Sequence, residues 1–144
     1  MNQNQPRAWI QELAGNLLAQ ERSGIRSVDS VNSDALAASR ICEKLRIPLS
    51  TLAGPVGFQA LLARALTVAR METRTLSTVQ VKGDGRVIGL EQVPSGEATQ
   101  AANALVSHLI NLLVTFIGEF LTLRLLRGIW SELPGNQLGG SQTT

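Results

Sequence analysis

The chain of 144 residues contains one cysteine and one histidine, too few of either to build the sites that these residues usually form. Cys42 alone excludes an internal disulfide bond and a cysteine-rich metal centre, and a lone thiol suits a reducing compartment. Cys42 and His108 together supply too few ligands for a usual zinc site. We therefore expect a cytoplasmic protein that binds no metal and no cofactor.

The chain also lacks a large excess of either charge, since it has 13 lysine and arginine residues and 11 aspartate and glutamate residues. A dedicated nucleic-acid binder usually carries a dense basic run, so this balance argues against nucleic acid as a partner. Residues 1–6 have neither the basic nor the apolar segment of a secretory signal peptide. Residues 82–85 lack the context of a phosphate-binding loop, and no other enzyme signature is visible, so we expect a non-catalytic protein.

What the chain does contain is helical periodicity, with apolar residues recurring every three or four positions through its first half. We expect helices over residues 6–24, 33–48 and 55–71, with a loop between the first two. Ser33 suits the N-cap of the second helix. Pro48 should end that helix, because an interior proline removes a backbone hydrogen bond and costs about 3 kcal/mol.

The pattern changes after Thr73 to one that is typical of strands. Residues 75–82 and 86–93 are rich in Val, Ile, Leu and Thr, and a Gly-Asp-Gly sequence separates them. This arrangement predicts a β-hairpin at about residues 75–93. Because a lone hairpin is marginally stable in water, it should lie on the helices or pair with a second copy of the chain.

The predicted fold class is mainly α (α+β), a helical bundle with one β-hairpin in the order α-α-α-β-β-α and a long C-terminal helix. A chain of this length forms one domain, which we place at residues 1–133. Residues 134–144, which begin with Pro-Gly and contain Gly-Gly-Ser, are expected to be a flexible tail.

The long apolar stretch over residues 98–133 is the central feature of this prediction. Its polar residues form a narrow helical stripe, and apolar side chains fill most of the remaining circumference; the stripe consists of Glu97, His108, Asn111, Thr115, Gly118, Glu119 and Thr122. After Thr122 the pattern reverses, so the helix either bends near Gly118 or enters a different environment. About 36 residues at ~1.5 Å each would span roughly 54 Å, far more than one small domain covers.

This excess length favours a homo-oligomer, with a two-fold dimer preferred, in which a second copy covers the helix. The function we expect is that of a small interaction, assembly or regulatory module, and another protein is the alternative partner. The predicted oligomer interface consists of Leu109, Leu112, Phe116, Phe120 and Leu123. Candidate functional polar residues are His108, Glu119, Arg124 and Arg127.

The candidate polar residues allow simpler interpretations as well. Glu119 is expected to face solvent on the polar stripe, and its alternative is an ion pair with Arg124 or Arg127 of the same or a second helix. A membrane span has the required length of about 20 residues. It is disfavoured because a carboxylate near the bilayer centre costs roughly 2.5–3.5 kcal/mol, and only Trp130 could contribute to an aromatic belt.

Two further functions remain open as alternatives. Residues 37–52 resemble the opening of a helix-turn-helix motif, and residues 40–74 hold a basic excess, which together would suit a DNA-binding regulator. Against this, Pro55 would interrupt the recognition helix after one turn. Residues 105–112 resemble the phospho-accepting box of two-component signalling kinases, which implies a phosphorelay role for His108, although the acidic neighbour and the proline of that box are missing.

Overall fold

The structure is a computed structural model that describes residues 7–24, 33–83 and 85–131. The chain is mainly helical with one small two-stranded antiparallel sheet, which confirms the predicted class at this level. Its elements in order are α1 (Ala8–Ser23), α2 (Ser33–Glu72), the 3-10 helix η2 (Arg74–Thr78), β1 (Gln80–Val81), β2 (Val87–Ile88), the 3-10 helix η3 (Leu90–Gln92), α3 (Ser95–Ile117) and α4 (Glu119–Ile129). The predictions for residues 1–6, 25–32, 84 and 134–144 lie outside the described residues.

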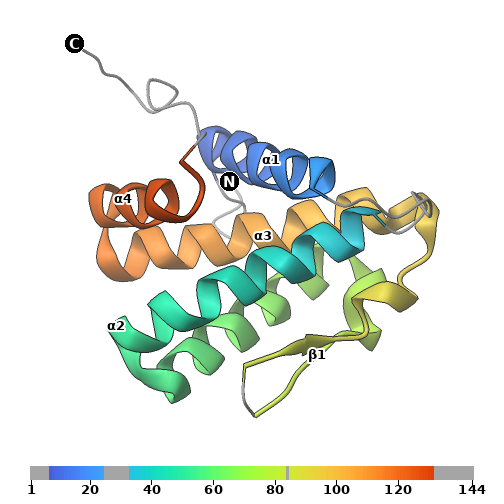
Figure 1. Ribbon diagram of the computed structural model, residues 1–144. Coiled ribbons are helices and arrows are strands. Elements are labelled where there is room, and N and C mark those ends of the chain that lie inside the picture. Colours follow the sequence, from blue (N-terminus) through green and yellow to red (C-terminus); the bar gives the residue numbers. More distant parts are fainter. Residues whose placement is uncertain (1–6, 25–32, 84, 132–144) are drawn as a thin grey trace.

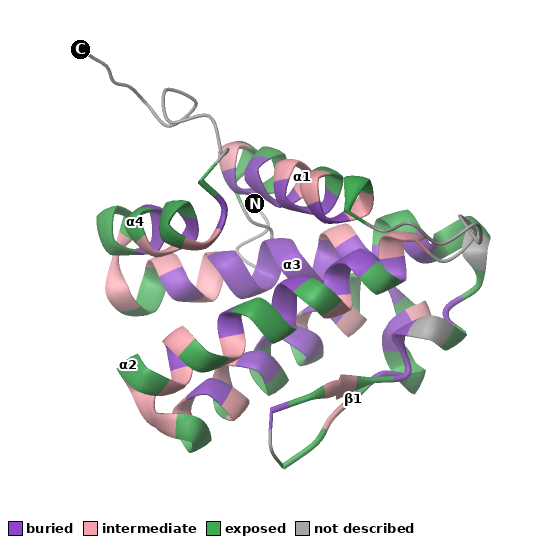
Figure 2. Cartoon of the chain, viewed as in Figure 1, coloured by how far each residue is buried: buried purple, intermediate pink, exposed green. Residues whose placement is uncertain are grey.

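Helix α3 forms the centre of the fold. It packs against α1, α2 and α4, with α1 and α4 on one side of it and the two arms of α2 on the other (Figure 1). Its middle is buried almost all round (Figure 2). The buried side chains there are Ala101, Ala102, Ala104, Leu105, Val106, Ser107, His108, Leu109 and Ile110. The most apolar stretch of the sequence is therefore covered within one chain.

Helix α2 is bent at Gly54, where φ is 84° and ψ is 157°. The prediction that Pro48 ends the second helix is wrong, because the helix continues for another turn. Leu45 and Leu49 are both buried, so the apolar stripe crosses Pro48 and its packing offsets the lost hydrogen bond. The helix bends instead at Gly54, whose backbone angles other residues avoid. Pro55, the predicted start of the next helix, follows directly.

A second glycine, Gly118, separates α3 from α4 with nearly the same backbone angles, φ 93° and ψ 159°. Its N–H donates to the carbonyl of Val114 (2.9 Å), and its own carbonyl accepts the hydroxyl of Thr122 (2.7 Å). Helix α4 therefore folds back along α3 (Figure 1). The predicted long C-terminal helix is divided into α3 and α4 at Gly118, where the sequence pattern had allowed a bend. The excess length of one straight helix, which favoured a second copy, is therefore absent.

The β-hairpin is present at the predicted place but is much shorter than predicted. Its ladder pairs Gln80 with Ile88 and Val81 with Val87, and 3-10 helices replace the outer parts of both strands. Buried Leu76 lies three residues before buried Val79, a spacing that suits a 3-10 turn rather than an alternating strand. Two residues in each strand leave little edge for pairing with another copy.

Side chains from α2 hold the hairpin against the helices, as the low stability of an isolated hairpin requires. Arg70 donates from Nε to the carbonyl of Leu76 (3.2 Å) and from Nη2 to the carbonyl of Val79. Gly85 (φ 87°) lies on the ring of Phe58, where an added Cβ would come within 3.0 Å. The hairpin thus belongs to the same core as the helices.

Replacing Gly118 by alanine should lower the free energy of unfolding by about 1–3 kcal/mol, because φ and ψ at this position lie in a region that is essentially restricted to glycine. No atom lies within 4 Å of the added Cβ, so backbone strain alone would cause the loss. Gly15→Ala in α1 is the matched control, with the same open surroundings. It should change stability by about 0–1 kcal/mol in the stabilising direction. Equal effects of the two variants in urea denaturation would contradict this assignment.

Candidate functional site

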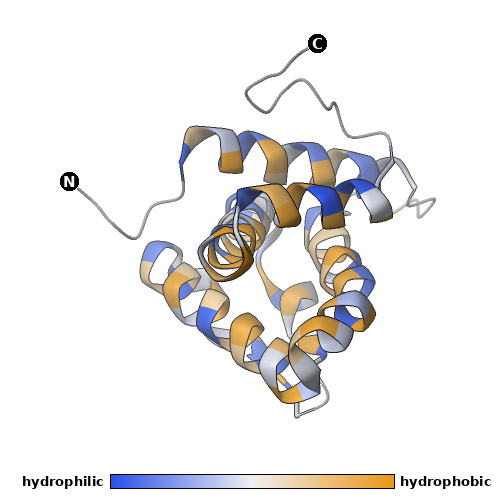
Figure 3. Ribbon diagram, turned by 90° about the vertical axis from the view of Figure 1, so that its left-hand side faces the viewer, coloured by the Kyte–Doolittle hydropathy of each residue, from blue (hydrophilic) through white to orange (hydrophobic). Residues whose placement is uncertain are grey.

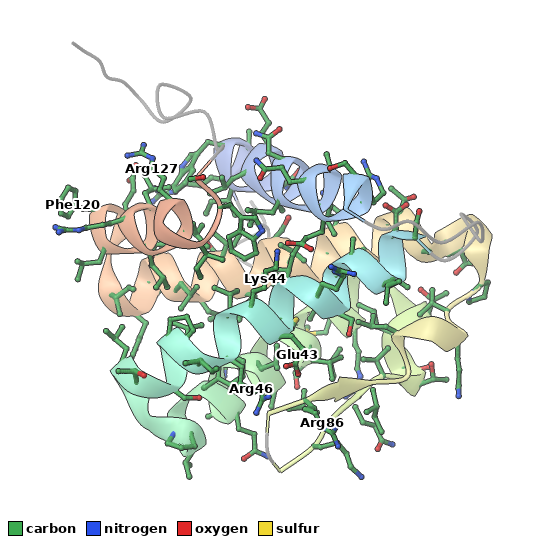
Figure 4. The ribbon with its side chains drawn as sticks, in the orientation of Figure 1. Glu43, Lys44, Arg46, Arg86, Phe120 and Arg127 are labelled. Carbon is green, nitrogen blue, oxygen red and sulfur yellow. The ribbon has the colours of Figure 1, made fainter. Side chains whose placement is uncertain are left out.

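The two glycine corners carry exposed apolar side chains at the same end of the molecule, on the left in Figure 1 and facing the viewer in Figure 3. Phe120 is 72% exposed and Phe116 is 61% exposed, and Phe120 projects away from the fold in Figure 4. We use the name apolar end for the exposed apolar residues beside Gly54 and Gly118, namely Leu52, Val56, Phe116, Phe120 and Leu121.

The exposure of Phe116 and Phe120 is notable because aromatic residues are few in this chain. The sequence has three phenylalanines and no tyrosine, and only Phe58 is buried. Burying a phenylalanine side chain is worth about 1.5–3 kcal/mol, so leaving two of three in solvent forgoes stability that the fold could have gained. Exposed apolar residues that gather at one place mark interaction sites.

The structure divides the predicted interface residues into two groups. Leu109 and Leu123 are buried in the core of their own chain, and Leu112 is half-buried. Phe116 and Phe120 are exposed. These five positions were chosen from the apolar side of one helix, whereas the break at Gly118 divides them between α3 and α4. The prediction missed Leu52, Val56 and Leu121, although the Gly-Pro pair at residues 54–55 marks a corner.

His108, which the helical pattern places on the polar stripe, is buried in the structure. It is 2% exposed, and its Nε2 lies 2.7 Å from Oε1 of Glu72 at the end of α2. Thr122 is buried as well, because its side of the helix faces the core. A phospho-accepting histidine must present a ring nitrogen to solvent, whereas Nε2 of His108 is buried and engaged by a carboxylate, so this geometry favours a structural role.

The remaining candidate polar residues lie on the outer side of α4. Glu119 is exposed in its first turn, in agreement with the solvent-facing interpretation. Arg124 and Arg127 are exposed further along the same helix (Figure 4 labels Arg127). The structure therefore brings one carboxylate and two guanidinium groups onto the helix that begins at the apolar end.

The features that suggested DNA binding do not form a helix-turn-helix recognition unit in the described residues. Residues 37–52 lie in one continuous helix, so the turn of a helix-turn-helix motif is absent from them. Much of the basic excess over residues 40–74 is also engaged within the chain. Arg40 and Lys44 pair with Glu21, and Arg70 donates to backbone carbonyls.

Glu21 is a buried carboxylate that the sequence patterns did not reveal. It is 3% exposed and accepts hydrogen bonds from Lys44 Nζ (2.5 Å), Arg40 Nε (3.2 Å) and Trp130 Nε1 (2.8 Å). The Lys44 ammonium also lies 5.8 Å from the centre of the Trp130 ring, a cation–π arrangement. The cluster ties α1, α2 and the residue after α4 together (Figure 4 shows Lys44). Its partners are 19 to 109 positions away in the sequence, which places them beyond any local pattern.

The environment of Glu21 acts on its pKa in two directions. Burial alone would raise the pKa, but hydrogen bonds from Lys44 and Trp130 and the charges of Lys44 and Arg40 outweigh it. The net pKa of Glu21 is therefore lower than its ordinary value of 4.5. The pKa of the Cys42 thiol is raised to about 12, mainly by burial, so this cysteine is an unreactive core residue.

Among the described residues, no group of three or more His, Cys, Asp or Glu side chains could hold a metal ion. Helix α2 and residues 96–117 of α3 are long and apolar enough to cross a membrane. However, α2 is divided at Gly54. Helix α3 is a core helix, and core helices also meet this criterion of length and composition. No family model, curated protein or solved structure matches this chain.

Replacing Glu21 by glutamine should lower the free energy of unfolding at neutral pH by about 1–3 kcal/mol, because a buried charged hydrogen-bond acceptor is lost. A lowered pKa means that ionised Glu21 stabilises the fold fully above pH 4.5 and that this contribution disappears as the pH falls through the folded-state pKa. The gap in stability between wild type and variant should therefore shrink on acidification.

Urea denaturation followed by tryptophan fluorescence measures this gap at each pH. Glu43→Gln is the control, since Glu43 makes an exposed ion pair with Arg46 (3.2 Å) that should be worth less than about 1 kcal/mol. A gap that stays constant from neutral to acidic pH would show that the charge of Glu21 does not stabilise the fold.

Proposed function

We propose that the chain is a small non-catalytic assembly module that forms a two-fold homodimer through its apolar end. The observation that carries the proposal is the exposure of Phe116 and Phe120 on either side of Gly118. In this proposal the helices act as a stable bundle that holds both rings at the surface, so no part of the chain needs to unfold before it associates.

The size of the apolar end is compatible with a dimer of moderate affinity. Two copies would together bury ten side chains, each worth about 1–2 kcal/mol for its exposed part, or roughly 10–20 kcal/mol before costs. The loss of translational and rotational freedom costs an estimated 4–15 kcal/mol. A net gain of about 8 kcal/mol, which corresponds to a dissociation constant on the order of micromolar, lies within the difference of these two ranges, and we take it as the expected affinity.

The mixed charges beside the apolar end fit a second copy better than an anionic lipid surface, because such a surface would attract Arg124 and Arg127 but repel Glu119. Glu119 lies next to Phe120, so a bilayer that received the ring would also receive a carboxylate near its anionic headgroups and apolar boundary. In a two-fold interface each patch meets its own copy, so Glu119 of one chain can pair with Arg124 of the other. Such a contact would be the ion pair between Glu119 and an arginine of a second helix that the sequence allows.

Phe120→Asp should convert a dimer into a folded monomer, because it places a charge at the centre of the proposed contact. Met71→Asp is the matched control. Met71 is equally exposed at 71%, but it lies at the C-terminal end of α2, far along the helix from Gly54 and the apolar end. Light scattering coupled to size-exclusion chromatography should give a dimer mass for wild type and Met71→Asp. Circular dichroism should show unchanged helix content in both variants.

Two results would overturn the proposal. One is a monodisperse wild-type monomer at concentrations on the order of 100 µM, well above the expected dissociation constant. The other is a dimer whose mass does not change in Phe120→Asp. A monomer that sediments with vesicles of anionic phospholipid, and does so less in Phe120→Asp, would instead assign the apolar end to a membrane surface.

A further inference from the structure

A cavity of about 410 Å³ with several polar side chains in its wall lies between α1, the end of α2 and α3, away from the apolar end. Helix α3 supplies most of its wall through residues spaced three or four apart, which lie along one side of a helix. Small residues at positions 96 and 104 leave the space open. The polar groups around it are Gln11, Glu72, Thr99, Gln100, Asn103 and Ser107. Its volume falls in the range of small-molecule sites, about 300–1,000 Å³.

The hydroxyl groups of this wall present acceptors to the cavity. A hydroxyl has one proton to donate and two lone pairs. Thr99 donates its proton to Oδ2 of Asp34, and Ser107 donates its proton to Oδ1 of Asn103 (3.2 Å). Both oxygens can then only accept a further hydrogen bond. A ligand that bonds to these two oxygens must therefore bring N–H or O–H donors.

The electrostatics of the cavity select for positive charge. Glu72 is the one charged side chain among its lining residues, and buried His108 positions that carboxylate through the 2.7 Å contact with Oε1. Glu72 is also the last residue of α2, where the helix dipole adds partial negative charge. The cavity therefore combines the exposed carboxylate of Glu72, which contacts His108, with a helix C-terminus and two acceptor hydroxyls.

We propose that this cavity is a binding site for a small organic cation, with an ammonium or guanidinium group on Glu72 and the hydroxyl oxygens of Thr99 and Ser107 accepting further hydrogen bonds. This site is separate from the apolar end, and its occupation is independent of dimer formation. The ligand is defined by its chemistry, which is a short molecule rich in N–H donors.

Two-dimensional amide NMR with agmatine and spermidine as probes tests the site, with glycerol and succinate as neutral and anionic controls. Both cations should shift the amide signals of residues 99–107 in a saturable manner at physiological salt, and the two controls should not. Glu72→Gln should weaken agmatine binding about tenfold or more, while its amide oxygen can still accept a hydrogen bond from His108. Glu43→Gln, which removes an exposed carboxylate of α2 outside the cavity, should leave binding unchanged.

Ala104→Leu provides a second, independent variant, because it fills the cavity without removing a polar group or a charge. It should abolish the shifts while circular dichroism reports an intact fold. The proposal is overturned if neither cation shifts these signals, if succinate shifts them equally, or if agmatine binds Glu72→Gln as tightly as it binds wild type.

Discussion

The backbone conformation at Gly118 is the constraint on which the rest of the structure depends. A positive φ with an extended ψ reverses the chain within one residue and sends α4 back along α3. If the helix had continued straight, Trp130, twelve positions after Gly118, would lie roughly 18 Å beyond the corner. Because the chain turns, Trp130 instead reaches Glu21, α4 closes the core, and Phe116 and Phe120 are left at the outside of the bend.

Three carboxylates hold the helices in the arrangement that the corners permit. Glu21 joins α1, α2 and the end of α4. Asp34, at the start of α2, accepts hydrogen bonds from Arg22 in the last turn of α1 (2.5 Å) and from Thr99 of α3. Glu72, at the end of α2, meets His108 of α3. Apolar packing has no direction, so these charge-assisted contacts supply the geometric specificity between helices. The proposed cation-binding site includes the third of these carboxylates, Glu72.

Helices, their order and the position of the hairpin could be predicted because they depend on local periodicity and turn chemistry. The errors arose where tertiary packing outweighs a local preference. Because Leu49 is buried, α2 continues past Pro48. Arg70 binds the carbonyls of Leu76 and Val79, and this part of the predicted strand forms a 3-10 helix instead. At the candidate site, Phe116 and Phe120 were found from apolarity alone. Leu52, Val56 and the Glu21 cluster were missed because they depend on how distant segments meet, which no local pattern records.

The central claim is that the apolar end is a contact surface between two copies. Amide hydrogen exchange at two protein concentrations, ~1 µM and ~200 µM, tests it most directly, because the N–H groups of Phe120 and Leu121 in the first turn of α4 have no intrahelical acceptor and exchange quickly in a monomer. The account predicts slower exchange over residues 116–121 at the higher concentration, with residues 95–105 unchanged. Identical exchange over residues 116–121 at both concentrations would contradict it.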